Sequence, residues 1–360
     1  MLECANAFGS AEIDTGRTSQ EQHRGDAVKP SNVLRTVAVA ATAVGVLAAG
    51  AASAAPDQAN VAIVVRDFSN PYWQALRDGA IAEGKKLGIP VTVQAGNNET
   101  DTVGENNKIS TMASQPYNCY GVVPVNGTNV ITPLLPISKR GTPIINLDTA
   151  LDAKAVKQSG LKITSFIGSD NSEAGRIAAH HMLKALDGKG EVAILEGIPG
   201  EQNGINRETA FRNTVKGKLD IVQATPADYE RNKALTKTEA MLRAHPNIKG
   251  IFAANDMMGL GAARAVLNAG KTKQITVVSI DGVTEAIKSV KNGSLSATIS
   301  QYPYAEGEMA VQACQKLVQG KQVPAHITSP IKLITQDNAD QALKAFPKPF
   351  FSFNDPFGQP

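Results

Sequence analysis

The sequence predicts an α/β fold of two similar lobes, each a parallel sheet with helices on both faces. Short β-branched apolar runs alternate along the chain with amphipathic stretches of about 10–18 residues. About ten strands are expected, which is more than one comfortable six-stranded sheet holds. The chain has 360 residues, enough for about two domains.

The expected strands are mostly continuous apolar runs, as is typical of parallel strands that are buried on both faces. They lie at Val61–Val65, Val91–Ala95, Tyr120–Val125, Ile144–Leu147, Ser165–Ser169, Val192–Glu196, Ile221–Ala224, Ile251–Ala254, Ile275–Ile280 and Ala297–Ser300. Amphipathic helices are expected between most of them, for example at Tyr72–Leu87, Ser172–Leu186 and Tyr304–Val318.

A targeting segment precedes the first strand. Lys29 and Arg35 come before the apolar run 36–52, which leads into Ala52-Ser53-Ala54, an A-x-A cleavage pattern. We therefore expect residues 1–54 to be a leader with a signal peptide that is cleaved after Ala54. The alternative is an uncleaved N-terminal anchor.

Charge and motifs exclude several classes of function. The net charge of +3 is too weak to predict binding to nucleic acid or to an anionic membrane. No Walker, H-E-x-x-H or G-x-S-x-G sequence occurs, and Gly259–Arg264 lacks the third glycine of a dinucleotide fingerprint. His180 and His181 are adjacent, so a helix points them about 100° apart. We expect no metal, no cofactor and no catalytic activity.

Two cysteines remain beyond the leader, Cys119 and Cys314. Their spacing matches neither a metal site nor a redox motif. The expectation is that both are buried free thiols, with a disulfide between them as the alternative.

The stretch Arg66–Trp73 follows the first expected strand and predicts a ligand-binding loop. Asn70 or Ser69 can cap a helix that begins at Pro71. In open α/β sheets, ligands bind outside the carboxyl ends of the strands. A cation, an amide and two aromatic rings at such an end suit a flat ring edged with hydroxyls. The alternative is that Tyr72 and Trp73 only pack the helix onto the sheet.

Acidic and amide side chains recur where other strands end. Asp148, Asn255 and Asp281 each follow an apolar run, and their repetition favours a shared cleft. For Asn171 and Asp256 we expect only a helix cap or a turn.

Taken together, these residues resemble the periplasmic sugar-binding proteins of ABC importers, of the ribose-binding and allose-binding type. The resemblance runs from about residue 60 to about residue 332. It is carried by Ser69–Trp73, Ile144–Asp148, Gly168–Asn171, Pro226–Arg231, Ala253–Asp256 and Asp281-Gly282. It implies two doubly wound Rossmann-like lobes joined by a three-stranded hinge, the type I periplasmic binding protein fold, which closes around a sugar.

The resemblance also implies the ligand-binding residues. They are Arg66, Asn70, Tyr72, Trp73 and Asp148 from the first lobe, with Arg207, Tyr229, Asn255, Asp281 and Gln301 from the second lobe or the hinge. Trp73, with Tyr72, and Tyr229 would sandwich the sugar ring. The aspartates would accept hydrogen bonds from hydroxyls, and the arginines would donate to sugar oxygens and pair with the acids.

The domain limits that the resemblance implies are 57–168 plus 302–331 for the first lobe and 169–301 plus 332–345 for the second. An aromatic and proline-rich tail, 346–360, follows as an ordered strap or a disordered end. We expect a monomer in the periplasm whose partners are a monosaccharide or sugar alcohol and an inner-membrane ABC permease, with no nucleic acid.

Three positions depart from the ribose-binding pattern. Arg66 looks more like the allose-binding type, Thr149 replaces an arginine, and Ile280 stands where ribose binders often have an aromatic residue. These departures make ribose a less suitable ligand and leave room for a hexose or a polyol.

Three other functions are alternatives. A sugar sensor for a chemoreceptor or kinase would use the same fold. A transcriptional regulator needs a helix-turn-helix before Asn60, where the sequence instead has the apolar run. An enzyme needs an acid–base pair, and none is identifiable.

Overall fold

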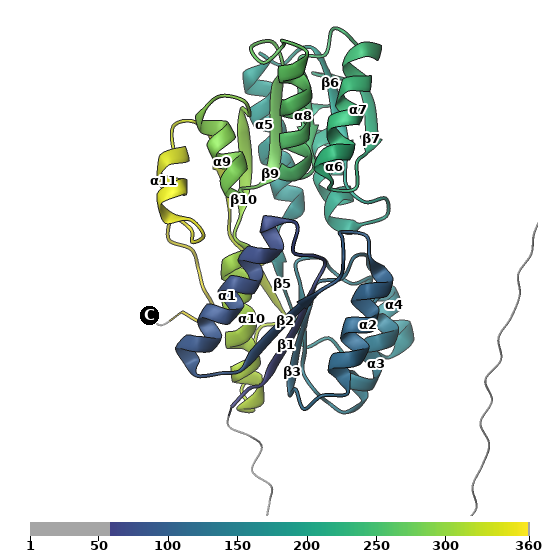
Figure 1. Ribbon diagram of the computed structural model, residues 1–360, viewed down its shortest axis with the longest axis vertical. Helices are drawn as coiled ribbons and strands as arrows, with labels where there is room; N and C mark the ends of the chain where they lie inside the picture. The colour runs from purple at the N-terminus through teal and green to yellow at the C-terminus, as the bar shows by residue number, and fades with distance from the viewer. Residues whose placement is uncertain (1–57, 359–360) are drawn as a thin grey trace, which may run out of the picture. The chain divides into compact units, whose positions relative to one another are not determined.

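The computed structural model describes residues 58–358, which form two six-stranded sheets (Figure 1). The first sheet has the order β11-β5-β4-β3-β1-β2, and all its strand pairs are parallel. We call this sheet and its helices the first lobe. Its strands are β1 (Val61–Val65), β2 (Val91–Ala95), β3 (Cys119–Val122), β4 (Ile144–Leu147), β5 (Ser165–Ser169) and β11 (His326–Ser329).

The second sheet, with its helices, is the second lobe. Its order is β12-β10-β9-β8-β6-β7, and its pairs are parallel except for the antiparallel pair of β12 with β10. Its strands are β6 (Glu191–Glu196), β7 (Asp220–Pro226), β8 (Gly250–Ala253), β9 (Thr276–Asp281), β10 (Ala297–Gln301) and β12 (Ile331–Ile334). The predicted fold class, two doubly wound α/β lobes, is confirmed.

Helices cover both faces of each sheet (Figure 1). Those of the first lobe are α1 (Pro71–Leu87), α2 (Thr102–Ala113), α3 (Ile131–Lys139), α4 (Ala153–Ser159) and α10 (Pro303–Val318). Those of the second lobe are α5 (Asn171–Ala185), α6 (Gln202–Val215), α7 (Arg231–Ala244), α8 (Asp256–Asn268), α9 (Thr284–Lys291) and α11 (Ala339–Ala345).

Strand β1 shows why a continuous apolar run suits this position. Ala62 and Val64 belong to the core that includes Ile109 of α2, whereas Ile63 lies in the core that includes Leu76 of α1. Since successive side chains of a strand point to opposite faces, burial under helices on both sides requires apolar residues at every position.

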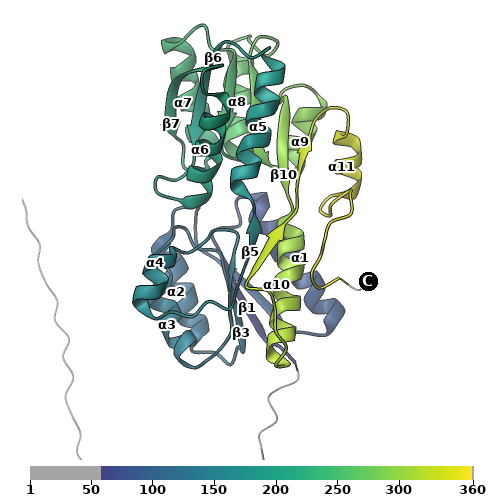
Figure 2. The ribbon, with the colours of Figure 1, turned by 180° about the vertical axis from the view of Figure 1, so that it is seen from behind.

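The chain passes between the two sheets three times: after β5, after β10 and between β11 and β12. Figure 2 shows β5 and β10 at the junction of the lobes. These passages form the hinge that the fold class implies. The residue limits predicted for the two lobes stay a prediction.

Two strands were missed by the sequence reasoning, β11 and β12. They are four residues each, Pro330 separates them, and each has exposed residues within it. Such short half-exposed runs carry little hydrophobic signal, and their place in the sheets depends on partners far along the chain.

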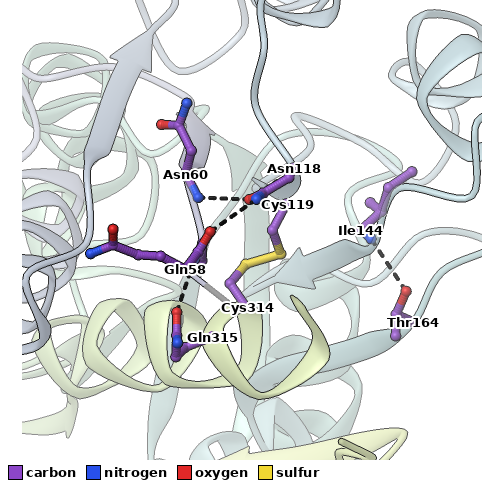
Figure 3. The surroundings of a disulfide bond; sticks show 9 residues. Gln58, Asn60, Asn118, Cys119, Ile144, Thr164, Cys314 and Gln315 are labelled. Atoms are coloured by element: carbon purple, nitrogen blue, oxygen red, sulfur yellow. Dashed lines mark hydrogen bonds between the residues drawn. A yellow bond between two sulfur atoms is a disulfide. The ribbon is translucent and has the colours of Figure 1, made fainter. Parts of the chain in front are cut away.

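The expectation of free thiols is wrong, because Cys119 and Cys314 form a disulfide with Cα atoms 5.7 Å apart (Figure 3). The bridge joins the start of β3 to α10 across 195 residues of sequence. Polar contacts surround it: Asn118 Oδ1 accepts from the Asn60 amide at 2.6 Å, and Gln315 Oε1 accepts from the Ala59 amide at 2.9 Å. The bridge therefore ties together two segments of the first lobe.

The predicted leader, residues 1–54, lies outside the described residues. Over residues 58–358, no helix combines the length and the apolar character needed to cross a membrane.

Candidate functional site

A cavity lies where the carboxyl ends of strands from both sheets meet. The non-atom space among its lining residues, open solvent included, is about 280 Å³. Its lining residues are Arg66, Asn70, Tyr72, Trp73, Glu99, Asp148, Glu201, Asn203, Arg207, Tyr229, Asn255, Asp281 and Gln301. The structure thus brings together all ten residues predicted from the sequence and adds Glu99, Glu201 and Asn203.

The loop after β1 supplies side chains that serve both the helix and the cavity. Asn70 caps α1, since its Oδ1 accepts from the Tyr72 amide at 3.0 Å, and its Nδ2 donates to Glu99 Oε1 at 2.7 Å. Tyr72 and Trp73 belong to the buried core of α1, and they also line the cavity. Tyr72 and Trp73 therefore do both things that the sequence suggested as alternatives: they pack α1 onto the sheet and they line the cavity.

Arg66 is buried and bridges the two lobes. Its Nη2 donates to Thr149 Oγ1 at 2.7 Å and to Glu201 Oε1 at 3.0 Å, and its Nη1 lies 3.8 Å from Glu99 Oε2. Burial by itself lowers the pKa of this guanidinium, but the carboxylates of Glu201 and Glu99 raise the pKa overall, so the group stays charged. Arg66 was expected to pair with an aspartate, and its partners are instead two glutamates.

Glu201 is the second-lobe partner of Arg66. It caps α6, where its Oε2 accepts from the Gly204 amide at 2.8 Å, and the same oxygen accepts from the Tyr229 hydroxyl at 2.6 Å. Burial raises the pKa of this carboxyl, yet Arg66 and the hydrogen bonds outweigh burial, so the pKa is lowered overall. Glu201 is therefore a fully buried, ionised and well-paired acid.

Asp148 joins the lobes a second time. Its Oδ1 accepts from the Tyr72 hydroxyl at 2.8 Å, and its Oδ2 accepts from Asn203 Nδ2 of the second lobe at 2.9 Å. Tyr72 and Asn203 line the cavity with Asp148, so both oxygens of this carboxyl already have donors within the lining.

On the second lobe, Arg207 and Asp281 form the expected pair of opposite charges. Arg207 Nη1 lies 3.8 Å from Asp281 Oδ1, and the same oxygen accepts from Gln301 Nε2 at 2.9 Å. Burial raises the pKa of Asp281 well above its usual range; Arg207 opposes this effect, and the nearby Asp256 adds to it. The carboxyl of Asp281 is therefore strongly desolvated in the cavity.

The backbone is strained at three of the lining residues. Asp148 has φ 54°, Tyr229 has φ 63° and Asp281 has φ 141°, values that non-glycine residues rarely adopt. Such conformations cost about 1–3 kcal/mol each and concentrate at functional sites. The strain therefore points to this cavity on grounds independent of the side chains.

Asn171 and Asp256 do not line the cavity, in line with the expectation of a cap or turn role, but neither of them caps its helix. Asp170, not Asn171, caps α5, and Asn171 Oδ1 instead accepts from Arg207 Nε at 2.7 Å. Asn255 caps α8, whereas Asp256 accepts from the Ser279 and Thr298 hydroxyls and from the Val283 amide. Both side chains hold neighbouring segments of the second lobe, and thereby support the cavity from behind.

The aromatic rings surround the guanidinium of Arg66. Its central carbon lies 5.4 Å from the centroid of the Trp73 ring and 5.9 Å from that of Tyr229. Tyr72 meets Trp73 edge-on, with ring centroids 4.7 Å apart. The predicted sandwich of a sugar ring between Trp73 and Tyr229 stays a prediction.

The three missed residues had a signal in the sequence. Glu99 follows the expected strand Val91–Ala95, and Glu201 and Asn203 follow the strand that ends at Glu196. Each is a polar residue just beyond a strand's carboxyl end, the same criterion that selected Asp148 and Asp281. Among the described residues, no group of three or more His, Cys, Asp or Glu side chains could hold a metal ion.

Comparison with known proteins agrees with this arrangement. A family model described as a periplasmic binding protein domain matches residues 61–322. The D-allose-binding periplasmic protein of Escherichia coli (strain K12) is 33% identical over 297 residues, which are 81% of this chain and 94% of that protein. The ribose import binding protein RbsB of Bacillus subtilis (strain 168) is 32% identical, over 77% of this chain and 87% of its own.

A solved structure gives the same result. An ABC transporter periplasmic solute binding protein from Actinobacillus succinogenes, with bound D-allose, superimposes with a TM-score of 0.75 at 33% identity. The match covers 79% of this chain and 99% of that one. These relatives are binding proteins, not enzymes. The chain therefore belongs to the periplasmic binding protein family, as a homologue of the allose- and ribose-binding proteins with the type I fold.

Proposed function

We propose that the protein captures a neutral hexose, pentose or sugar alcohol in the cavity between its lobes and delivers it to an ABC importer of the inner membrane. The observation that carries the proposal is the lining itself. Four carboxyl groups and four carboxamides converge with two arginines and three aromatic rings on a space of about 280 Å³. A ligand with many hydroxyls and an apolar ring face matches that set.

The balance of charges favours a neutral ligand. The lining has four acids, Glu99, Asp148, Glu201 and Asp281, against two cations, Arg66 and Arg207. Because both arginines already pair with acids, an added carboxylate or phosphate would meet no unpaired cation in this lining and would be repelled by the acids.

Export to the periplasm is part of the proposal. The A-x-A pattern at Ala52–Ala54 supports it, and so does the disulfide between Cys119 and Cys314, because disulfides persist in oxidising compartments. Delivery to an importer is supported by the functions that the relatives' names state.

The proposal is tested by titrating the mature protein, from Ala55, with pentoses, hexoses and sugar alcohols. Trp73 is the only tryptophan of the sequence and it lines the cavity, so its fluorescence reports directly on the site. A sugar at about 100 times its Kd should also stabilise the protein by about 2.7 kcal/mol and raise its Tm. If no sugar changes either signal, mass spectrometry of the denatured protein must reveal a co-purified sugar; otherwise the proposal is wrong.

Replacing Trp73 with alanine is expected to weaken sugar binding at least tenfold. The ring is buried, and it donates from Nε1 to Glu99 Oε1 at 2.9 Å, so the variant loses both an apolar ring face and a fixed neighbour. Calorimetry measures the change, with Tyr117→Ala as a control in the first lobe away from the cavity. Wild-type affinity in a folded Trp73→Ala protein would remove Trp73 from the site.

A further inference from the structure

Glu99 lines the cavity, and its carboxyl group is held in a defined orientation. It lies in the loop between β2 and α2, on the first lobe. Its Oε1 accepts from Asn70 Nδ2 at 2.7 Å and from Trp73 Nε1 at 2.9 Å. Two donors on one oxygen hold the carboxyl group in a single orientation, with the other oxygen pointing away from them.

The second oxygen, Oε2, is buried and accepts no hydrogen bond from the residues that the structure describes. Its only cationic neighbour there is Arg66, whose Nη1 is 3.8 Å away, too far for a hydrogen bond. Among the described lining residues, the only other buried side-chain atom without a hydrogen-bond partner is Gln301 Oε1, which is also an acceptor. The cavity thus offers two buried acceptors that need donors, one from the first lobe and one from the hinge.

We propose that Glu99 is a specificity-determining residue of this cavity, which accepts a hydrogen bond from a ligand hydroxyl at Oε2. The inference rests on the proposed function, since it takes the ligand to be polyhydroxylated. A deoxy ligand leaves the acceptor unpaired, and an acidic ligand brings a second negative charge next to it.

The protonation of Glu99 makes this contact depend on pH. Burial raises the pKa of Glu99 to about 7; Arg66 and the hydrogen bonds from Asn70 and Trp73 oppose the rise, and Asp67 adds to it. The other charged or titratable groups of the lining are Tyr72, Asp148, Glu201, Arg207, Tyr229 and Asp281. A ligand hydroxyl that donates to Oε2 favours the ionised form, so affinity should rise as the pH rises through about 7, with release of a proton on binding.

The test compares Glu99→Gln with the matched control Glu105→Gln by calorimetry at pH 6 and pH 8. Glu105, on α2, is also buried with a pKa raised by burial to about 7, but it does not line the cavity. Its Oε2 accepts instead from Asn129 Nδ2 at 2.6 Å. Glu99→Gln should lose at least tenfold in affinity at pH 8 and bind without pH dependence, whereas Glu105→Gln should keep the wild-type affinity and pH profile.

Deoxy derivatives of the bound sugar complete the test, because the derivative that lacks the recognised hydroxyl should bind wild type and Glu99→Gln equally. If wild type binds a sugar and Glu99→Gln binds it equally well at both pH values, the role of Glu99 is wrong and the proposed function stands. If wild type binds no sugar in any form, the proposed function fails and the inference fails with it.

A second, independent observation concerns residues 346–358, which we call the C-terminal strap. They follow α11 in the second lobe, and Figures 1 and 2 both show the chain running from α11 to end beside α1 and α10 of the first lobe. The strap is ordered rather than a free end: Phe350, Phe351, Phe353 and Phe357 are partly buried against the core.

The strap has contacts on both lobes. On the second lobe, the Phe351 ring lies 5.3 Å from Lys332 Nζ on β12. On α10 of the first lobe, Lys348 Nζ pairs with Glu308 at 3.1 Å, and Lys316 Nζ lies 5.5 Å from the Phe357 ring.

The strap also covers the hinge and borders the ligand cavity. The ring centroid of Phe351 lies 5.6 Å from that of Tyr302, a residue between β10 and α10. Phe346 and Pro347 line a small cavity together with Tyr72, Asp281 and Gln301. Those three residues also line the candidate site.

We infer that the C-terminal strap restrains the opening of the lobes. The strap is joined to α11 of the second lobe and contacts α10 of the first lobe through Lys348 and Phe357, so a hinge motion that separates the lobes must break these contacts or those that Phe351 makes over the hinge. The contacts stabilise the closed arrangement and slow the release of ligand.

The strap is tested by ending the chain after Ala345, with a chain that ends after Gly358 as the matched control. X-ray scattering of the ligand-free proteins should show a larger radius of gyration only for the shorter chain, independent of any ligand. Stopped-flow release of sugar should be at least threefold faster. If the shorter chain does not fold, Phe351→Ala replaces it. Equal radii of gyration in folded variant and control would overturn the inference.

Discussion

Replacing Asp281 with alanine is expected to weaken sugar binding about a hundredfold, which is about 2.8 kcal/mol of binding free energy. The carboxyl accepts from Gln301 at 2.9 Å and lies 3.8 Å from Arg207, so its loss leaves one buried donor without its acceptor and one buried cation without its counter-charge. Burial also raises the pKa of Asp281 well above its usual range, so removal of the carboxyl relieves part of its desolvation cost. The Tm of the ligand-free variant should therefore fall far less than its affinity.

Backbone strain is the competing explanation, because alanine tolerates a φ of 141° poorly. Asp281→Gly removes the same carboxyl and accommodates that φ. Equal losses of affinity in both variants, measured by calorimetry, would assign the effect to the carboxyl. An exposed second-lobe acid outside the cavity lining, Asp337, serves as the surface control. Near wild-type affinity in both Asp281 variants would contradict the role of this residue.

Removing the disulfide is expected to produce the largest change in stability. The bridge closes a loop of 195 residues, for which the chain-entropy model gives about 5 kcal/mol, and measured values are typically about 2–4 kcal/mol. At about 2–4 °C per kcal/mol, the double variant Cys119→Ala/Cys314→Ala should melt about 5–15 °C lower than wild type.

Sugar affinity should stay unchanged in that variant. Cys119 begins β3, and the cavity lies at the carboxyl ends of the strands, so the bridge is at the opposite edge of the sheet. Wild-type protein reduced by a phosphine should have the same Tm as the double variant. This comparison separates the effect of the bond from that of the substitutions. Identical melting of oxidised and variant proteins would show that the bridge adds no stability.

The buried runs and their spacing predicted the fold class because these signals are local. A strand such as Val61–Val65 can be recognised from its five successive apolar residues, all of which are buried in the structure. β11 was not found, since its side chains alternate between exposed and buried and it pairs with β5 across more than 150 residues of sequence. Its location in the first sheet depends on that partner and not on its own composition.

The candidate site was largely predictable for a related reason. Parallel strands place their carboxyl ends at one edge of a sheet, so Asp148 and Asp281 could each be assigned to the ligand-binding edge of a lobe, and the resemblance to two-lobed binding proteins implied that the two edges face one cleft. Asn171 and Asp256 were misread because a short polar side chain at a helix start has two uses, and the choice depends on which donors the neighbouring segments present.

The sequence by itself determined the order of strands and helices, the polar residues at the strand ends and the resemblance to sugar-binding proteins. Tertiary structure alone decided the partners: Glu201 for Arg66, Cys314 for Cys119, and the first lobe for the C-terminal strap. The physical reason is distance along the chain. Periodicity and capping act within a few residues, whereas these contacts join segments far apart in sequence, and the packing of the lobes selects them.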